Sequence, residues 1–80
     1  IRDSVAMSEA RLSQAKAELT RAEADLKLAE TRKQRYEFLV SKGAVSRDEY
    51  DQVVSTCDAA VALVAAGKAS VVAAEKDLKS

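Results

Sequence analysis

The chain has 80 residues, with 13 basic and 13 acidic side chains, one cysteine, no histidine and no proline. Eighty residues are enough for one domain. The balanced charge disfavours a nucleic-acid partner, which usually selects a clustered basic patch. Without histidine, neither a Ser-His-Asp triad nor a structural zinc site around a single thiol can form. A glycine-rich phosphate loop is also absent, so we expect no enzyme: no catalytic residues, no metal site and no cofactor.

The composition favours long helices, because Ala, Leu, Glu, Lys and Arg lose little rotamer freedom in a helix. The longest unbroken apolar run, residues 59–66, has eight residues, whereas a membrane span needs about 20. We therefore expect no membrane span. The chain opens without a signal peptide and carries helical patterning to both ends. We interpret it as a segment of a longer protein.

Both halves of the chain carry residues repeated every seven positions, the spacing of a coiled-coil seam. In the first half the larger residues are Val5, Leu12, Leu19 and Leu26, and the smaller ones are Ser8, Ala15, Ala22 and Ala29. In the second half the larger ones are Tyr50, Cys57, Val64, Val71 and Leu78, and the smaller ones are Val53, Ala60, Gly67 and Ala74. The pattern predicts two helices, each with one stripe of alternating large and small residues.

The segment 41–46 joins the two stripes. Gly43 suits the left-handed position that ends a helix. Ser46 and Glu49 have the spacing of a capping box, with Ser46 as the N-cap. We predict one helix over about residues 3–42, a tip at 43–46 and a second helix over about residues 47–79. Because so short a connection makes the helices antiparallel, the predicted fold is all-α: one two-helix antiparallel coiled-coil hairpin.

The turn also sets the register between the two helices, in which facing residue numbers sum to about 86. Leu19 then faces Gly67, and most other large seam residues also face a small one, which allows the helices to approach closely, while Tyr50 would meet Tyr36. The predicted facing pairs also include Leu12 with Ala74, Leu26 with Ala60, Cys57 with Ala29, Val64 with Ala22, and Val71 with Ala15. A helix of forty residues predicts a rod of roughly 60 Å.

The second helix has more apolar residues than one seam needs. Alanine is a good surface helix former, which explains the off-seam alanines equally well. For Val61, Leu63 and Val72 we favour a second interface, because exposed apolar surface often marks a protein contact. Side-by-side packing of neighbouring hairpins would use it.

Arg35 and Leu39 lie one turn apart near the predicted tip, outside the seam. They are candidate contact residues, but Leu39 has an equally simple interpretation as a cover for Ala44 in the helix C-cap, and Arg35 as a solvated side chain. The N-cap role likewise explains Ser46 fully. We expect Cys57 to be buried in the seam and inert, although a reactive thiol at this position is an alternative.

The stretch from Arg35 to Asp51 resembles the hairpin tip of the periplasmic adaptor proteins, also called membrane fusion proteins, of tripartite efflux pumps of the AcrA and MexA kind. That family has an Arg, Leu, Ser motif at offsets zero, four and eleven, and Arg35, Leu39 and Ser46 match it. The sequence Asp48-Glu49-Tyr50-Asp51 is similar to the opening of the family's second helix, and the heptads extend the likeness over essentially the whole chain.

The resemblance implies a role in transport. The tip of such a hairpin docks onto a TolC-type outer-membrane channel, and Arg35, Leu39 and Ser46 would be the protein-binding residues. Neighbouring adaptor protomers would form a hexameric ring, and domains outside this segment would reach the inner-membrane transporter. The full-length protein would lie in the periplasm and associate with the inner membrane, as the adaptor of a resistance-nodulation-division (RND) pump.

Two other interpretations remain at this point. A type I secretion adaptor, or another HlyD-like adaptor, shares the hairpin but has longer arms. A generic structural coiled-coil spacer would have the same heptads and no function at its tip. Reversing the charge at Arg35 would then leave assembly unharmed.

Overall fold

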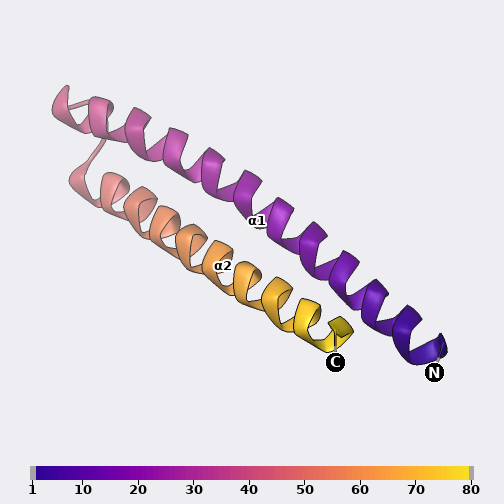
Figure 1. Cartoon of the computed structure of the whole chain (residues 1–80). Helices are drawn as coiled ribbons and strands as arrows, with labels where there is room; N and C mark the ends of the chain where they lie inside the picture. Colours follow the sequence, from indigo (N-terminus) through magenta and orange to yellow (C-terminus); the bar gives the residue numbers. More distant parts are fainter. Residues whose placement is uncertain (1, 80) are drawn as a thin grey trace.

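A computed structural model describes residues 2–79 as two long helices joined by a short turn. Helix α1 spans Arg2–Ser41 and helix α2 spans Arg47–Lys79. The two helices run antiparallel and side by side, with the turn at one end and both termini at the other (Figure 1). The molecule measures 62 × 13 × 12 Å. The predicted all-α hairpin is therefore confirmed, and its length agrees with the rise of a forty-residue helix.

The turn satisfies the backbone groups that α1 leaves unpaired at its end. Gly43 has a φ of 72°, a conformation that a residue with a Cβ adopts at a cost. The Ala44 N–H donates to the Leu39 carbonyl at 2.9 Å, and the Gly43 N–H donates to the Val40 carbonyl at 3.1 Å. These two bonds form a Schellman motif, which ends α1 and turns the chain back.

A capping box begins α2, as the sequence predicts. The Glu49 N–H donates to the Ser46 hydroxyl oxygen at 3.0 Å. The Ser46 N–H donates in return to a carboxylate oxygen of Glu49 at 3.4 Å. Two of the donors that every helix N-terminus leaves free are thus paired within the turn itself. The Schellman motif and the capping box together fix how the two arms meet.

The core is a single seam between α1 and α2, and small residues fill most of it. The buried residues are Ala15, Ala29, Cys57, Ala60, Val64 and Ala74. The larger seam residues Leu12, Leu19 and Leu26 are half-buried, because a partner helix covers them from one side only. Leu26 packs against the cluster of Ala29, Cys57 and Ala60, as the register predicts.

Leu19 and Gly67 approach each other closely in the seam. A Cβ placed on Gly67 would lie 3.2 Å from Leu19 Cδ1 and 3.4 Å from Leu19 Cα. The predicted facing of these two residues is therefore confirmed. Only glycine fits this position without displacing Leu19, so Gly67 lets the backbones of α1 and α2 come together.

Val5 is the exception to the predicted seam, since 45% of its surface is exposed. In the register of the hairpin its facing position lies past Lys79, the last residue of α2 that the structure describes. No residue of α2 within Arg47–Lys79 therefore covers it. Ser8, which is half-buried, is the first seam residue that α2 covers.

Helix α2 is long and apolar enough, by length and composition, to cross a membrane, although its longest apolar run has only eight residues. Asp58 and Lys68 interrupt its apolar middle. Along its length it packs against α1, in which charged residues recur at nearly every turn. Its apolar content thus has two parts: one fills the seam, and the other, including Val61, Leu63 and Val72, is exposed.

Candidate functional site

The predicted docking residues occupy the closed end of the rod. Arg35 and Leu39 lie in the last two turns of α1, and Ser46 immediately precedes α2. Arg35 and Ser46 are exposed, whereas Leu39 is half-buried. The guanidinium of Arg35 has five N–H donors in a planar fork, which suits carboxylate or carbonyl acceptors on a partner. The exposed donors of Arg35 and the apolar side chain of Leu39 are side-chain types that could contact a protein partner.

The backbone of Leu39 takes part in the C-cap of α1. Its carbonyl accepts the Ala44 N–H at 2.9 Å and so belongs to the Schellman motif. Its side chain is only partly covered by the hairpin. The apolar surface left open lies one turn from Arg35, so the backbone of Leu39 shapes the tip while part of its side chain remains exposed.

Ser46 is likewise engaged in the turn and still available to a partner. Its hydroxyl oxygen accepts the Glu49 N–H at 3.0 Å. A hydroxyl has one donor and two acceptor lone pairs, so its own proton can serve a second contact. A change at Ser46 will therefore affect the start of α2 as well as any docking.

Phe38 and Lys42 complete the tip, and the sequence analysis did not single them out. Phe38 is 61% exposed, and the Lys42 ammonium lies 5.5 Å from the centre of its ring, a cation–π contact. Phe38 follows Thr31 by seven residues, on the edge of α1 away from the seam. That heptad position predicts an exposed side chain, and it could have identified Phe38 from the sequence. We define the tip surface as Arg35, Phe38, Leu39, Lys42 and Ser46.

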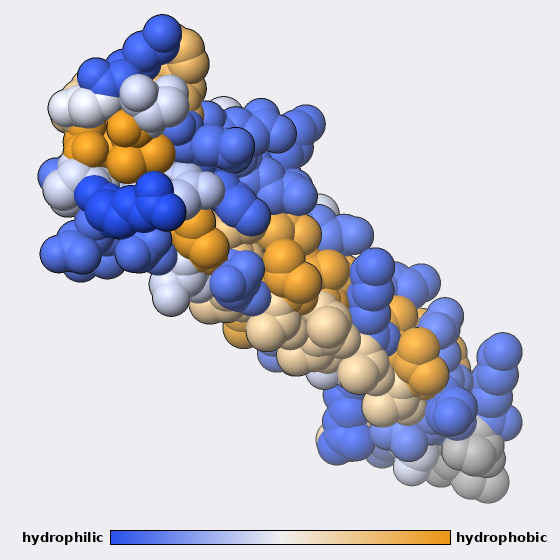
Figure 2. Space-filling view, turned by 90° about the vertical axis from the view of Figure 1, so that its left-hand side faces the viewer, coloured by the Kyte–Doolittle hydropathy of each residue, from blue (hydrophilic) through white to orange (hydrophobic). Residues whose placement is uncertain are grey.

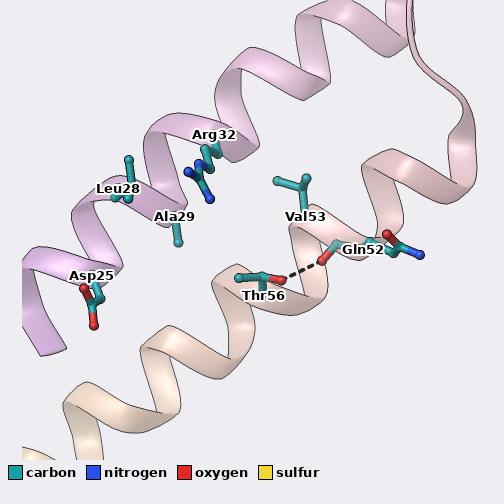
Figure 3. A pocket seen from close by; sticks show the side chains of 7 residues that line it. All are labelled: Asp25, Leu28, Ala29, Arg32, Gln52, Val53 and Thr56. Carbon is teal, nitrogen blue, oxygen red and sulfur yellow. Dashed lines mark hydrogen bonds between the residues drawn. The ribbon is translucent and has the colours of Figure 1, made fainter.

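A shallow groove runs from the tip surface along the hairpin. From α1 it is lined by Asp25, Leu28, Ala29 and Arg32, and from α2 by Gln52, Val53 and Thr56. Figure 3 shows Ala29 and Val53 pointing between the helices, while Leu28 points away from them. The Thr56 hydroxyl donates to the Gln52 carbonyl at 3.0 Å. Arg35 and Leu39 continue this row of α1 residues at three- and four-residue steps, so groove and tip share one side of the rod.

A second groove continues on the same side towards the termini, between Glu18, Arg21 and Asp25 of α1 and Leu63, Ala66 and Ser70 of α2. Both grooves are open and shallow, unlike the enclosed pockets that bind small molecules. Within residues 2–79, no group of three or more potential metal ligands occurs. The side chains here are suited to contact with another helix.

Cys57 lies in the seam, 5% exposed and unpaired. Its burial among Ala29, Ala60 and Leu26 agrees with the structural role predicted from its heptad position. A buried thiol in apolar surroundings is less reactive than an exposed one next to a base. The structure thus gives the thiol a packing role.

Comparison with known proteins identifies the family. No curated protein matches the chain significantly. Residues 11–80 match the family model described as RND MFP, alpha-helical hairpin domain, where MFP stands for membrane fusion protein. The match covers most of the chain and both helices, and the two-helix hairpin of the structure agrees with the description. The chain belongs to the α-helical hairpin domain family of the RND membrane fusion proteins.

Proposed function

We propose that this hairpin is part of the periplasmic adaptor subunit of a tripartite RND-type efflux pump, and that its tip surface docks onto a TolC-like outer-membrane channel. Proteins of this family are adaptors, which work with an outer-membrane channel and an inner-membrane transporter, and are not a class of enzymes. The observation that carries the proposal is the tip: exposed Arg35 and half-buried Leu39 one turn apart, with Ser46 at the start of α2.

In this proposal each tip residue has a separate role. Arg35 donates hydrogen bonds to carbonyl or carboxylate groups of the channel, and Leu39 supplies an apolar contact. Ser46 adds a small polar contact beside its cap. A tip of this size binds weakly alone, and several adaptors in one ring, six in our proposal, would raise the overall affinity by avidity.

The rest of the pump sets the position of the hairpin. The 62 Å rod would extend through the periplasm towards the channel. Further domains of a longer adaptor protein would associate with the inner membrane and contact the transporter. The match to an RND hairpin family favours this assembly over a type I secretion adaptor.

The double variant Arg35→Asp/Leu39→Asp in the full-length adaptor tests the docking role. We expect loss of efflux and of channel co-purification, because the variant reverses the charge and removes the apolar contact at the tip. The adaptor itself should accumulate normally, since Arg35 is exposed and Leu39 is only half-buried. Efflux that survives both changes would refute tip docking and favour the generic spacer.

A matched control lies at the other end of the rod. Met7 and Arg11 are both exposed, are four residues apart, and occupy the same heptad positions as Arg35 and Leu39. The variant Met7→Asp/Arg11→Asp makes similar chemical changes far from the tip. We expect channel co-purification to persist in this control.

A further inference from the structure

The apolar stripe of α1 is interrupted near the tip. Residues 30–35 have the sequence Glu-Thr-Arg-Lys-Gln-Arg, the longest stretch of the chain without an apolar side chain. Within this stretch the seven-residue repeat places Lys33 at the seam position that Leu19 and Leu26 occupy further along the rod. A lysine in a coiled-coil seam lowers stability, because its ammonium has to reach water. The sequence thus breaks the seam at one defined level.

Burial of side chains follows this interruption. Among the described residues 2–79, all buried side chains lie within 15–29 of α1 and 57–74 of α2. None of residues 30–56 is buried, although this range includes the end of α1, the turn and the start of α2. The seam position Lys33 is itself only half-buried. Because tertiary packing supplies most of the stability of a helix in a protein, the two helices are held together weakly here.

Side-chain size keeps the helices from closing up at this level. The register of the seam places Lys33 opposite Val53. One turn nearer the tip it places Tyr36 opposite Tyr50. All four residues are half-buried, and neither pair includes a small residue. Because helix spacing depends on the side chains at the contact, we infer that the helices approach less closely here than they do at Gly67.

A groove opens at the same level. It is lined by Arg32 of the polar stretch and by Gln52 and Val53 of α2, and Figure 3 shows Ala29 and Val53 pointing into the space between the helices. On the face shown in Figure 2, hydrophilic residues separate an apolar patch at the tip from the apolar band along the rest of the rod. The side chains at this level therefore leave the space between the helices partly unfilled.

The turn beyond the interruption is held by its own hydrogen bonds. The Schellman motif at Gly43 and the capping box of Ser46 and Glu49 are both closed within the turn and the adjacent helix ends. Glutamate, arginine, lysine and glutamine are also good helix formers, so α1 can remain helical through residues 30–35. The hairpin therefore consists of a closed tip and a packed rod, joined by a loosely packed segment.

We define the neck as residues 30–36 of α1 and the facing residues 50–56 of α2. We propose that the neck opens by separation of the two helices, and that this opening lets the tip surface change its angle to the rod as it docks. A rod packed equally tightly along its whole length would hold its tip in one orientation, whereas the neck adapts the tip without unfolding either helix. This inference rests on the proposed docking function and adds a conformational step to it.

Hydrogen exchange in the full-length adaptor measures opening of the neck without any channel. We expect backbone amides of the neck to exchange several-fold faster than those of residues 15–29 and 57–74, because local stability follows buried apolar contact. Lys33→Leu should slow exchange in the neck several-fold, since it restores the apolar stripe. Gln34→Leu places the same side chain at an exposed position beside the seam and is the control that should not slow it. Neck amides as slow as those of the rod, or equal effects of the two leucines, would overturn the proposal.

A disulfide across the neck tests whether its opening serves docking. In a background with Cys57→Ala, the variant Lys33→Cys/Val53→Cys would tie the two helices together at this level. We expect the oxidised adaptor to capture several-fold less outer-membrane channel than the same protein after reduction. Equal capture in both states would refute a role for opening in docking. Failure of the two thiols to form a disulfide would show that these positions do not face each other, which contradicts the neck as defined.

A second disulfide, within the rod, is the matched control. A Cβ on Gly67 would lie 3.5 Å from Leu19 Cβ, a separation found in natural disulfides. Leu19→Cys/Gly67→Cys in the same background therefore ties the helices where they already pack closely. Its oxidation should leave channel capture unchanged. Equal loss of capture from the two disulfides would show that docking is not sensitive to the neck in particular, and would contradict the proposal.

This inference and tip docking can fail separately, because hydrogen exchange requires no channel. Slow exchange in the neck, together with lost channel capture in Arg35→Asp/Leu39→Asp, would keep tip docking and refute the neck. Fast exchange in the neck of an adaptor whose channel capture survives those two changes would keep the loosely packed neck and refute docking through the tip surface.

Discussion

Ser46 shows how one tip residue serves both folding and contact. Its hydroxyl oxygen accepts the Glu49 N–H, and its backbone N–H donates to the Glu49 carboxylate. The cap needs only an acceptor oxygen at this position, whereas a contact with a partner can also use the hydroxyl proton. An aspartate keeps an acceptor at the N-cap but removes the hydroxyl proton, so it separates the two roles.

We predict that Ser46→Ala lowers the free energy of unfolding by about 1 kcal/mol, the usual cost of a lost N-cap. Ser46→Asp should leave stability nearly unchanged and still weaken channel co-purification, because it places a negative charge on the tip surface and removes the hydroxyl proton. Thermal unfolding followed by circular dichroism measures the first effect, and affinity capture of the channel measures the second. Equal loss of stability in both variants would show that the cap geometry does not carry the contribution.

Among single residues, Phe38 marks the limit of what was inferred from the sequence. Its heptad position placed it outside the seam, but nothing in the spacing distinguished a solvated aromatic from a contact residue. The structure adds its 61% exposure and the Lys42 ammonium 5.5 Å from its ring. Val5 was predicted to lie in the seam and is exposed, because it lies outside the part of α1 that α2 covers up to Lys79.

At the scale of the helices, local sequence signals determined most of the fold. Heptad spacing located the seam, Gly43 ended α1, and Ser46 with Glu49 began α2. The short turn then fixed the register, and size complementarity predicted that Leu19 faces Gly67. The grooves were not predicted, because their depth depends on side-chain volumes beside the seam, as at Leu28 and Arg32.

The close contact at Gly67 makes the spacing of the helices sensitive to substitution. We predict that Gly67→Leu destabilises the hairpin by about 1–3 kcal/mol, the usual cost of overpacking, because its side chain would meet Leu19. Ala69→Leu, at an exposed position of the same helix, is the control and should change stability by less than about 0.5 kcal/mol. Urea unfolding measures both.

Exchanging the large residue at 19 with the small residue at 67 provides a stricter test of this contact. The double variant Leu19→Ala/Gly67→Leu should recover part of the loss, since it moves the large residue to the other helix without adding volume. Independent, additive losses in the double variant would show that Leu19 and Gly67 are not energetically coupled and would contradict the register.

In the proposed arrangement of the whole molecule, the tip of the rod and its long sides have different partners. In the proposed function the tip surface contacts a channel, and the sides of the rod contact neighbouring adaptors of the ring. Phe38 and Leu63 provide a matched pair of probes, since each is 61% exposed, one at the tip and the other midway along α2. A partner that contacts only the tip would be captured from Phe38 and not from Leu63. A spacer without tip function would give no such difference between the two positions.

The most direct measurement of tip docking is therefore photo-crosslinking in living cells, with a photoreactive amino acid placed at Phe38 or at Leu63 of the full-length adaptor. We predict that the probe at Phe38 captures the outer-membrane channel and that the probe at Leu63 captures another adaptor copy. Capture of the channel from Leu63 but not from Phe38, or no channel adduct from either position in assembled pumps, would contradict docking through the tip.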